Sequence, residues 1–427
     1  MSGLHADLQI TTLTNGLVLI MERKPWMEGA YCHAHLRLGS CDEDYEKDKG
    51  LFDQGLCHLL EHTLFRGSKD YGEDEISRRT VGIGGSIDAT TDRHVTSYCG
   101  WSPSGGLPTM LDAIDSMIFR SNINLKELEE ERAAVIGEVE ARDADPLAHA
   151  RDSSLSLLYP NHKIRFPVQG VVDYLAEIRA TRIREIIRGY HKPQNAVLCL
   201  SGSIPDEIEI EDMVYEHARG FSHRTRAANS EEVARNHGDP TPIGSHASET
   251  ETLGYGTGFA SVLSLPVPRE TDDWDRVFAL VQGILTGGVL DAAFGSIPNL
   301  TSYGVIPENL IDLSVLSIYV TGEFSRKTLE QVRVAMQSLS KRMSGGKIQD
   351  VHLEEAKIRV AGRLAQERNQ PSPLVLGMRQ TLGSWWTPSF EDVPALERIE
   401  KKKVSGMLKG LFGGESSVLC EAIQEQA

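Results

Sequence analysis

The spacing of apolar and polar residues predicts two stretches that each mix helices and strands. In the first, from residue 8 to about 205, the apolar run Val197–Gly202 is typical of a buried strand. In the second, apolar runs predict two strands, and helical spacing predicts three helices. These elements are expected at Ser261–Leu265, Trp274–Leu285, Val315–Val320, Lys327–Met343 and Leu353–Arg368. The mixture predicts the α+β fold class.

A polar segment rich in serine and histidine, Phe221–Thr252, separates the two stretches and is the best candidate for a linker. We therefore expect an N-terminal domain at residues 1–220, a linker at 221–252 and a C-terminal domain at 253–427. A chain of 427 residues is long enough for two or three domains with sizeable cores.

The segment Leu125–Arg142 consists of strong helix formers and is predicted to be a helix. Asn124 followed by Glu127 resembles a capping box at its start. The pair Asp145-Pro146 is expected to end it.

Two glutamates of this helix, Glu131 and Glu138, are seven residues apart and therefore share a face. Apolar residues crowd the same region, and a carboxylate in such surroundings is usually paired or bound to a metal. The simpler interpretation, a solvated acidic face, is accepted for Glu127, Glu129 and Glu130. Glu138 stands apart from that run, which favours a buried role.

The pentad His58-Leu59-Leu60-Glu61-His62 is an H-x-x-E-H pattern. On a helix, His58 and His62 lie one turn apart and can direct their rings at one metal ion. Glu61 lies on nearly the same face and can act on a metal-bound water without being a ligand. Fourteen histidines will sometimes pair by accident. The apolar residues around the pentad nevertheless favour a buried helix whose polar face lines a site, and the glutamate-rich helix Leu125–Arg142 offers candidates for a third ligand.

The chain resembles the pitrilysin (insulinase-type) zinc metallopeptidases, in the short two-domain form found in mitochondrial processing peptidase and bacterial relatives. The resemblance covers most of the N-terminal half and does not rest on the pentad alone. The segments that carry it are Leu13–Leu17, Leu38–Glu43, Gly55–His62, Phe65–Ser68, Gly84–Thr91, Thr96–Tyr98, Tyr159, His162, Pro167, Gly170 and Tyr190–Asn195.

The resemblance implies two similar α/β domains in tandem, which form half of a clamshell. It implies Zn²⁺ held by His58, His62 and Glu138, which lies 76 residues after His62. It implies Glu61 as the general base and Glu131 as a supporting glutamate. A peptide substrate would bind as an added strand along Ser86, Asp88, Ala89 and Thr90.

Two departures from the family pattern bear on function. Asp88 stands where the family usually has Asn, which favours a basic feature in the substrate. Active members also carry an Arg and a Tyr seven residues apart in the C-terminal half. Tyr303 matches the Tyr, but Ser296 falls at the Arg position. We therefore expect a heterodimer whose second subunit supplies the Arg/Tyr pair, with a homodimer as the alternative.

Charge and composition narrow the class of protein. The net charge of −17 argues against a nucleic-acid partner, which requires a basic surface. The longest apolar region, Val277–Leu290, is interrupted by Gln282, Thr286 and glycines, so no membrane span is expected. The start of the chain shows no secretory signal. Six cysteines without C-x-x-C spacing favour a reduced, cytoplasmic location.

The sequence therefore predicts a zinc endopeptidase that works with a second subunit to form a closed chamber. Maturation of a ribosomally made peptide and general oligopeptide turnover are both compatible with it. One alternative is a non-catalytic assembly subunit, although structural relatives of that kind typically lose the pentad, which is intact here. Another is a zinc enzyme that acts on a substrate other than a peptide.

Overall fold

The structure, a computed structural model, describes residues 8–46, 51–72, 75–222, 237–254, 256–269, 271–369 and 393–425. The chain forms two compact units. The described residues of the first unit lie within Met1–Val139 and Pro167–Asn236. Those of the second lie within Glu140–Phe166, His237–Asn369 and Trp385–Ala427.

The first unit contains a six-stranded sheet in the order β1-β2-β8-β3-β7-β6. The β2–β8 pair is parallel and the other neighbours are antiparallel. The strands are β1 (Leu8–Thr12), β2 (Val18–Arg23), β3 (Gly29–Leu36), β6 (Ser86–Thr91), β7 (Thr96–Pro103) and β8 (Ala196–Gly202), with a separate short pair β4 (Tyr45–Glu46) and β5 (Leu51–Phe52). The predicted strand Val197–Gly202 is β8, at the centre of the sheet.

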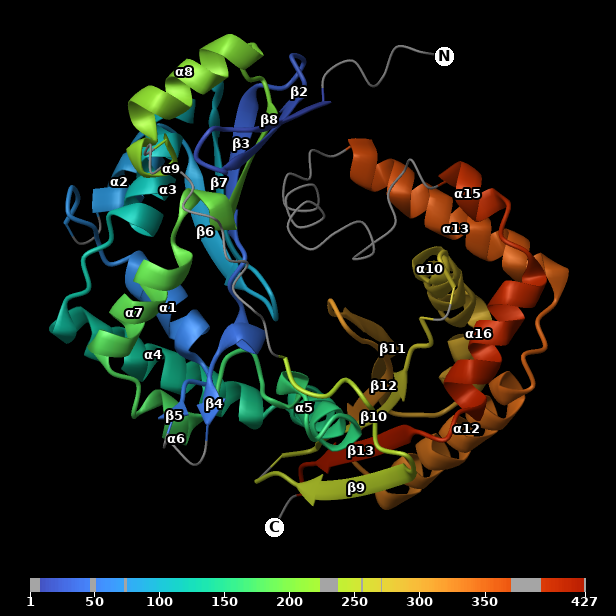
Figure 1. Cartoon of the computed structure of the whole chain (residues 1–427). Helices are drawn as coiled ribbons and strands as arrows, with labels where there is room; N and C mark the ends of the chain where they lie inside the picture. Colours follow the sequence, from blue (N-terminus) through green and yellow to red (C-terminus); the bar gives the residue numbers. More distant parts are fainter. Residues whose placement is uncertain are drawn as a thin grey trace. The chain divides into compact units, whose positions relative to one another are not determined.

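Helices of the first unit cover one face of this sheet. They are α1 (Leu56–Leu64), α2 (Glu75–Gly82), α3 (Leu107–Phe119), α4 (Leu125–Asp143), α6 (Val172–Leu175), α7 (Ala180–Tyr190), α8 (Glu207–His217) and α9 (Arg219–Ser222). Figure 1 shows α1, α2, α3 and α7 on that face. Alternate β3 residues, such as Cys32 and Ala34, pack into the core with these helices. A small cluster of Ile20, Val197 and Cys199 lies apart from that core.

The second unit contains a five-stranded sheet in the order β11-β12-β10-β13-β9. Among its described strands, β13 and β9 pair in parallel and the other neighbours are antiparallel. The strands are β9 (His246–Thr252), β10 (Gly258–Pro266), β11 (Leu300–Asn309), β12 (Ser314–Glu323) and β13 (Ser417–Ile423). The helices are α5 (Pro146–Leu158), α10 (Trp274–Ile284), α11 (Leu290–Phe294), α12 (Arg326–Ser344), α13 (Asp350–Asn369), α15 (Val393–Glu397) and α16 (Lys401–Gly413).

The two sheets have the same connectivity. If β1 is left out, each sheet has five strands, which can be ranked by their position in the sequence. Across both sheets the strands then follow the order first, last, second, fourth, third. In both sheets the first and last strands pair in parallel. In each unit two helices, α1 and α2 or α10 and α11, connect the second strand to the third. The fold class predicted from the sequence, two similar α/β domains in tandem, is confirmed.

The segment boundaries differ from the predicted ones. Both ends of the predicted linker 221–252 belong to regular elements, α9 at one end and β9 at the other, whereas residues 223–236 lie outside the described residues. The segment Glu140–Phe166 belongs to the second unit. There α5 packs on β10 and β13, and Ser154 Oγ lies 2.7 Å from Ser264 Oγ. Asp145 does not merely end α4, because its carboxylate caps α5 by accepting from Ala148 N.

One helical run is long and apolar enough to cross a membrane by length and composition alone. It is Trp274–Phe294, with a mean hydropathy of 1.7. This finding corrects the expectation that no apolar stretch reaches that length. Val277, Phe278 and Leu280 of α10 are buried in the core of the second unit, and a core helix passes the same test.

Candidate metal centre

The start of α1 is fixed by backbone contacts that only glycine permits. Gly55 precedes the helix with φ at 99°, in the left-handed region. A Cβ at this position would lie 2.7 Å from Leu175 Cδ2 and 3.0 Å from Gly170 Cα. The buried carboxylate of Glu43 accepts hydrogen bonds from Gly55 N at 2.9 Å and Cys57 N at 2.8 Å. These contacts set where the pentad begins along the helix.

The apolar residues of α1 anchor the helix in the core, and its histidines lie side by side. Leu59, Leu60 and Leu64 are buried in the core of the first unit. The rings of His58 and His62 have centroids 4.8 Å apart and planes at 82° to each other. The i, i+4 spacing therefore places both imidazoles in one site, as the sequence predicts.

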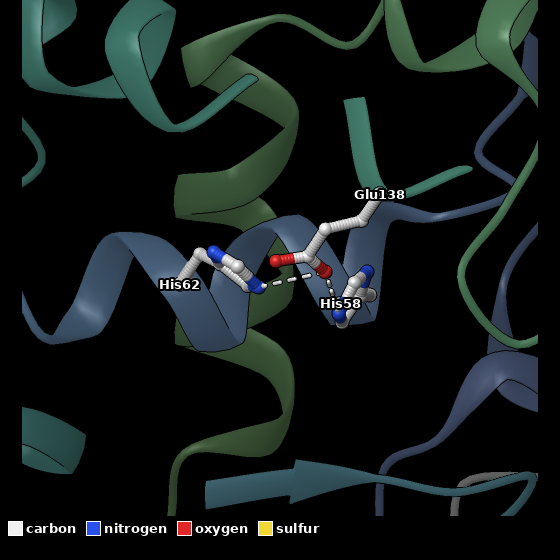
Figure 2. Close-up of side chains that lie close together, drawn as sticks. All are labelled: His58, His62 and Glu138. Carbon is white, nitrogen blue, oxygen red and sulfur yellow. Dashed lines mark ion pairs between the residues drawn. The ribbon is translucent and has the colours of Figure 1, made fainter. Parts of the chain in front are cut away.

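Glu138 of α4 completes a group of three ligand side chains. Its Oε2 lies 3.6 Å from His58 Nε2 and 3.7 Å from His62 Nε2. Figure 2 shows the Glu138 carboxylate pointing towards both rings, with dashed lines for the two ion pairs. Two ligands at about 2.0–2.1 Å from one tetrahedral zinc ion lie roughly 3.3–3.5 Å apart. The two observed separations are close to that value, so these residues fit a zinc ion. The structure thus brings together the three ligands predicted from the sequence.

Glu131 holds His62 from the side away from Glu138. Its Oε2 lies 3.0 Å from His62 Nδ1, and its Oε1 accepts a hydrogen bond from Arg66 Nε at 2.5 Å. A proton on Nδ1 that points to a carboxylate leaves the lone pair of Nε2 for a metal. The geometry suits the supporting role that the family resemblance implies for Glu131.

Glu61 is buried beside the two histidines. Thr91, at the end of β6, donates a hydrogen bond from Oγ1 to Glu61 Oε2 at 2.5 Å. Burial raises the pKa of the Glu61 carboxyl, although the Thr91 hydrogen bond and His62 oppose the shift. A carboxyl group with a raised pKa can accept and release a proton closer to neutral pH.

The predicted substrate strand is β6, the last strand in the order of its sheet. It pairs with β7 from Ser86 opposite Trp101 to Thr91 opposite Thr96. Asp88 and Thr90 are exposed, whereas Ala89 is buried. Because Asp88 Oδ1 accepts from Ala89 N at 2.9 Å, the carboxylate is held against its own strand.

Tyr303 lies on β11 of the second unit. Its hydroxyl donates a hydrogen bond to Asp291 Oδ1 at 2.8 Å, and this contact raises the pKa of Tyr303. β11 holds the same place in the order of its sheet as β6 does in the first unit. The role of Tyr303 as the family tyrosine stays a prediction.

Sequence reasoning did not single out Arg66 or Thr91. Thr91 follows the predicted substrate residue Thr90, so strand alternation directs the two side chains to opposite faces. That alternation was a usable signal for Thr91. Arg66 follows the end of α1, and nothing in its local pattern indicates that it reaches a glutamate of α4. Cys57, next to the first histidine, is buried, and its Sγ donates to Gly39 O at 3.3 Å.

Residues 36–170 match the family model described as Insulinase (Peptidase family M16). A Bacillus subtilis protein named uncharacterized zinc protease YmxG is 24% identical over 416 residues, which are 94% of this chain and 95% of that protein. The chloroplastic stromal processing peptidase of rice is 29% identical over 227 residues, 50% of this chain and 17% of that protein.

Solved structures show the same fold. A protease from Helicobacter pylori matches 97% of this chain and 99% of its own, with a TM-score of 0.81 and 16% identity. A peptidase M16 inactive domain from Pseudomonas fluorescens matches 98% of this chain and 99% of its own, with a TM-score of 0.78 and 14% identity. The resemblance to insulinase-type peptidases is thus confirmed. Residues 36–170 match the M16 family model, and the described chain has the fold of M16-like peptidases.

Proposed function

We propose that this chain is a zinc-dependent endopeptidase. One observation carries the proposal: His58, His62 and Glu138 converge at the separations of ligands to one ion, with Glu61 beside them. Two imidazoles and one carboxylate form a ligand set typical of catalytic zinc, which keeps one coordination position open. The family match and the names of relatives as zinc proteases support zinc as the metal.

The bound ion would supply Lewis-acid activation of a water molecule and of the substrate carbonyl. The protein supplies the proton transfers. Glu61 takes the proton of the attacking water on Oε1, while Thr91 holds Oε2 through its hydrogen bond. The same carboxyl then passes the proton to the leaving amine. Glu131 keeps His62 turned towards the site.

The substrate would bind as an extended strand beside β6. A peptide that pairs with the outer edge of β6 gains main-chain hydrogen bonds without regard to its sequence. Ser86, Ala89 and Thr90 provide this edge. Asp88 adds a negative charge where the family usually has Asn, which favours peptides with a basic residue at the matching position.

A second subunit is part of the proposal. Ser296 stands where active family members carry Arg, so this chain lacks one of the groups that polarise the substrate carbonyl. We infer that a partner with the Arg/Tyr pair closes a chamber over the metal site in the cytoplasm. A homodimer that uses Tyr303 without the Arg is the alternative. Maturation of a ribosomally made peptide would suit such an enclosed site.

The test is cleavage of a mixed peptide library by the purified chain, with zinc measured in the same sample. We expect about one zinc per chain. Cleavage by the chain alone should be weak, because the Arg is missing, and a chelator should abolish it. The matched control is Glu61→Gln, which keeps the shape of the side chain but cannot take up the proton. It should bind zinc normally and lose peptide cleavage.

Each outcome has a distinct meaning. A Glu61→Gln variant with full activity would remove Glu61 from the mechanism. Zinc bound without cleavage by the wild-type chain would direct attention to the missing Arg, and adding a partner subunit should then restore activity. A chain that binds no zinc would overturn the proposed function.

A further inference from the structure

Three side chains form a continuous path from the surface of the first unit to a predicted metal ligand. Arg66 donates from Nε to Glu131 Oε1 at 2.5 Å, and Glu131 Oε2 lies 3.0 Å from His62 Nδ1. Arg66 also donates from its second guanidinium nitrogen to Glu130 Oε2 at 3.1 Å. The path starts just after the end of α1 and returns to α1 by way of α4.

We propose that Arg66 is a positioning residue for the metal centre, which it tunes through Glu131. The inference rests on the proposed zinc site. The guanidinium holds Oε1, so the other oxygen of the same carboxylate is fixed against His62 Nδ1. This contact orients the imidazole so that Nε2 faces Glu138, 3.7 Å away.

Burial along the path supports a restraining role. The side chains of Glu131 and His62 are 15% and 21% exposed, and that of Arg66 is 25% exposed. The Glu130 side chain, at 42%, is more exposed. A charge-assisted hydrogen bond between partly buried groups holds its geometry better than an ion pair in water. We therefore expect the contact to Glu131, rather than the one to Glu130, to affect the orientation of His62.

Two effects of Arg66 on a metal cation oppose each other. Its positive charge repels the ion, so removing the charge alone would tighten binding. Its hydrogen bond orients Glu131 and, through it, His62, so removing the bond would weaken binding. Because Glu131 lies between Arg66 and His62 and carries the opposite charge, the repulsion is largely compensated. Orientation is expected to dominate.

The experiment compares zinc affinity in three variants of the full chain, by competition with a chromophoric chelator. Arg66→Met removes the charge and the hydrogen bond, and Arg66→Lys keeps the charge but loses the planar guanidinium. Glu130→Gln is the matched control, because it alters another partner of Arg66 and leaves Glu131 intact. Melting curves of the metal-free proteins establish that each variant is folded.

We expect Arg66→Met to weaken zinc binding by about 10- to 100-fold, as loss of a group that orients a ligand does elsewhere. Arg66→Lys should lie between Arg66→Met and wild type, and Glu130→Gln should bind like wild type. In metal-free protein, ¹⁵N spectra should show His62 with its proton on Nδ1, and Arg66→Met should lose this preference. A purely structural role would leave the ring tautomer unchanged.

Equal or tighter zinc binding by Arg66→Met would overturn the inference, since it would mean that charge repulsion outweighs orientation. An unchanged His62 tautomer in Arg66→Met would also contradict it. These failures are distinguishable from failure of the proposed function, in which wild type itself would bind no zinc.

Discussion

Thr91 connects the strand expected to bind substrate with the expected general base. Its hydroxyl donates to Glu61 Oε2 at 2.5 Å, and the hydrogen bond is partly buried. A hydrogen bond to a charged group contributes roughly 1.5–3 kcal/mol, and about 1.4 kcal/mol corresponds to a tenfold change in rate. We therefore expect Thr91 to influence the rate of cleavage through Glu61.

We expect Thr91→Val to lower kcat by about tenfold or more and to leave KM and zinc content unchanged. Valine keeps the shape of threonine and removes only the donor. Peptide cleavage kinetics with parallel zinc measurement check this prediction. Thr91→Ser retains a hydroxyl and should stay close to wild type. If both variants were equally impaired, the hydrogen bond could not be the cause.

His191 makes the first unit sensitive to acid. Burial lowers its pKa to about 4 from the ordinary 6.5, and Nδ1 lies 2.7 Å from Ile118 O. Below pH 6.5 the unfolded chain takes up a proton that the folded chain refuses. The stability contributed by the neutral ring is therefore present above pH 6.5 and is lost as the pH falls towards 4.

We expect the free energy of unfolding to fall by at most about 1.4 kcal/mol per pH unit over this range through His191. His191→Gln removes the titrating ring and keeps an N–H donor for Ile118 O. Melting temperatures of the two metal-free proteins between pH 7.5 and 4.5 measure the difference. As the pH falls, the melting temperature of wild type should decrease more than that of His191→Gln. A constant gap would contradict the assignment.

The ligand residues were predictable from sequence because helical geometry fixes the relation between His58 and His62. Glu138 was predictable from the family resemblance, but the buried role expected for it is wrong, because its side chain is 48% exposed. Strand alternation gave a signal for Thr91, whereas Arg66 contacts Glu131 across 65 residues of sequence, and a single sequence contains no information on such a pair. The structure places the predicted residues, whereas their roles await the experiments above.

α1 depends on the close approach of two loop segments. Gly55 and Gly170 both have positive φ, and their backbones touch closely enough that a Cβ on either would clash with the other. The segment that contains Gly170 therefore fixes where α1, the helix with the histidine pentad, begins. The family resemblance included Gly170, and this contact is the physical reason for a glycine there.

We expect Gly55→Ala to destabilise the first unit and to weaken zinc binding. The left-handed backbone alone costs about 1–2 kcal/mol for a residue with a Cβ, and the contacts to Leu175 and Gly170 add to it. Gly189→Ala in α7 is the matched control, because a Cβ there meets nothing within 4 Å. The control should be stabilised by up to about 1 kcal/mol. Thermal melting and zinc titration of both variants distinguish them.

Two of the elements that the sequence did not predict are β9 and α5. β9 is polar and mostly exposed, so it lacks the apolar alternation by which strands are predicted, and its parallel pairing with β13 holds it. α5 contains serines that suit a loop, yet one of them, Ser154, meets Ser264 of β10. In both β9 and α5, tertiary contacts determine the secondary structure. The strongly periodic helices, such as α12, match their predictions closely.

The two units are not consecutive in the sequence. The chain leaves the first unit after Val139, contributes α5 to the second unit and returns to the first unit at Pro167. The N-terminal domain predicted at residues 1–220 would thus contain α5, a helix that packs on the sheet of the second unit. Ala150, Leu155 and Leu158 of α5 are buried in the full chain.

We expect a chain truncated after residue 220 to aggregate, because these apolar side chains of α5 would face water. A matched truncation in which residues 144–160 are replaced by a Gly/Ser segment should be more soluble. Sedimentation or light scattering of the two fragments measures the difference. Equal solubility would show that α5 finds other contacts in the fragment.

The outer edge of β6 also bears on how the protein behaves without a substrate. A strand edge that is open to an incoming peptide is equally open to the same edge of another copy. Asp88 places a carboxylate on this strand, and the chain as a whole carries a net charge of −17. Two copies that approach edge to edge would therefore repel each other, whereas a basic peptide would be attracted. We therefore expect Asp88, proposed above to favour basic peptides, also to keep copies of the protein from polymerising through β6.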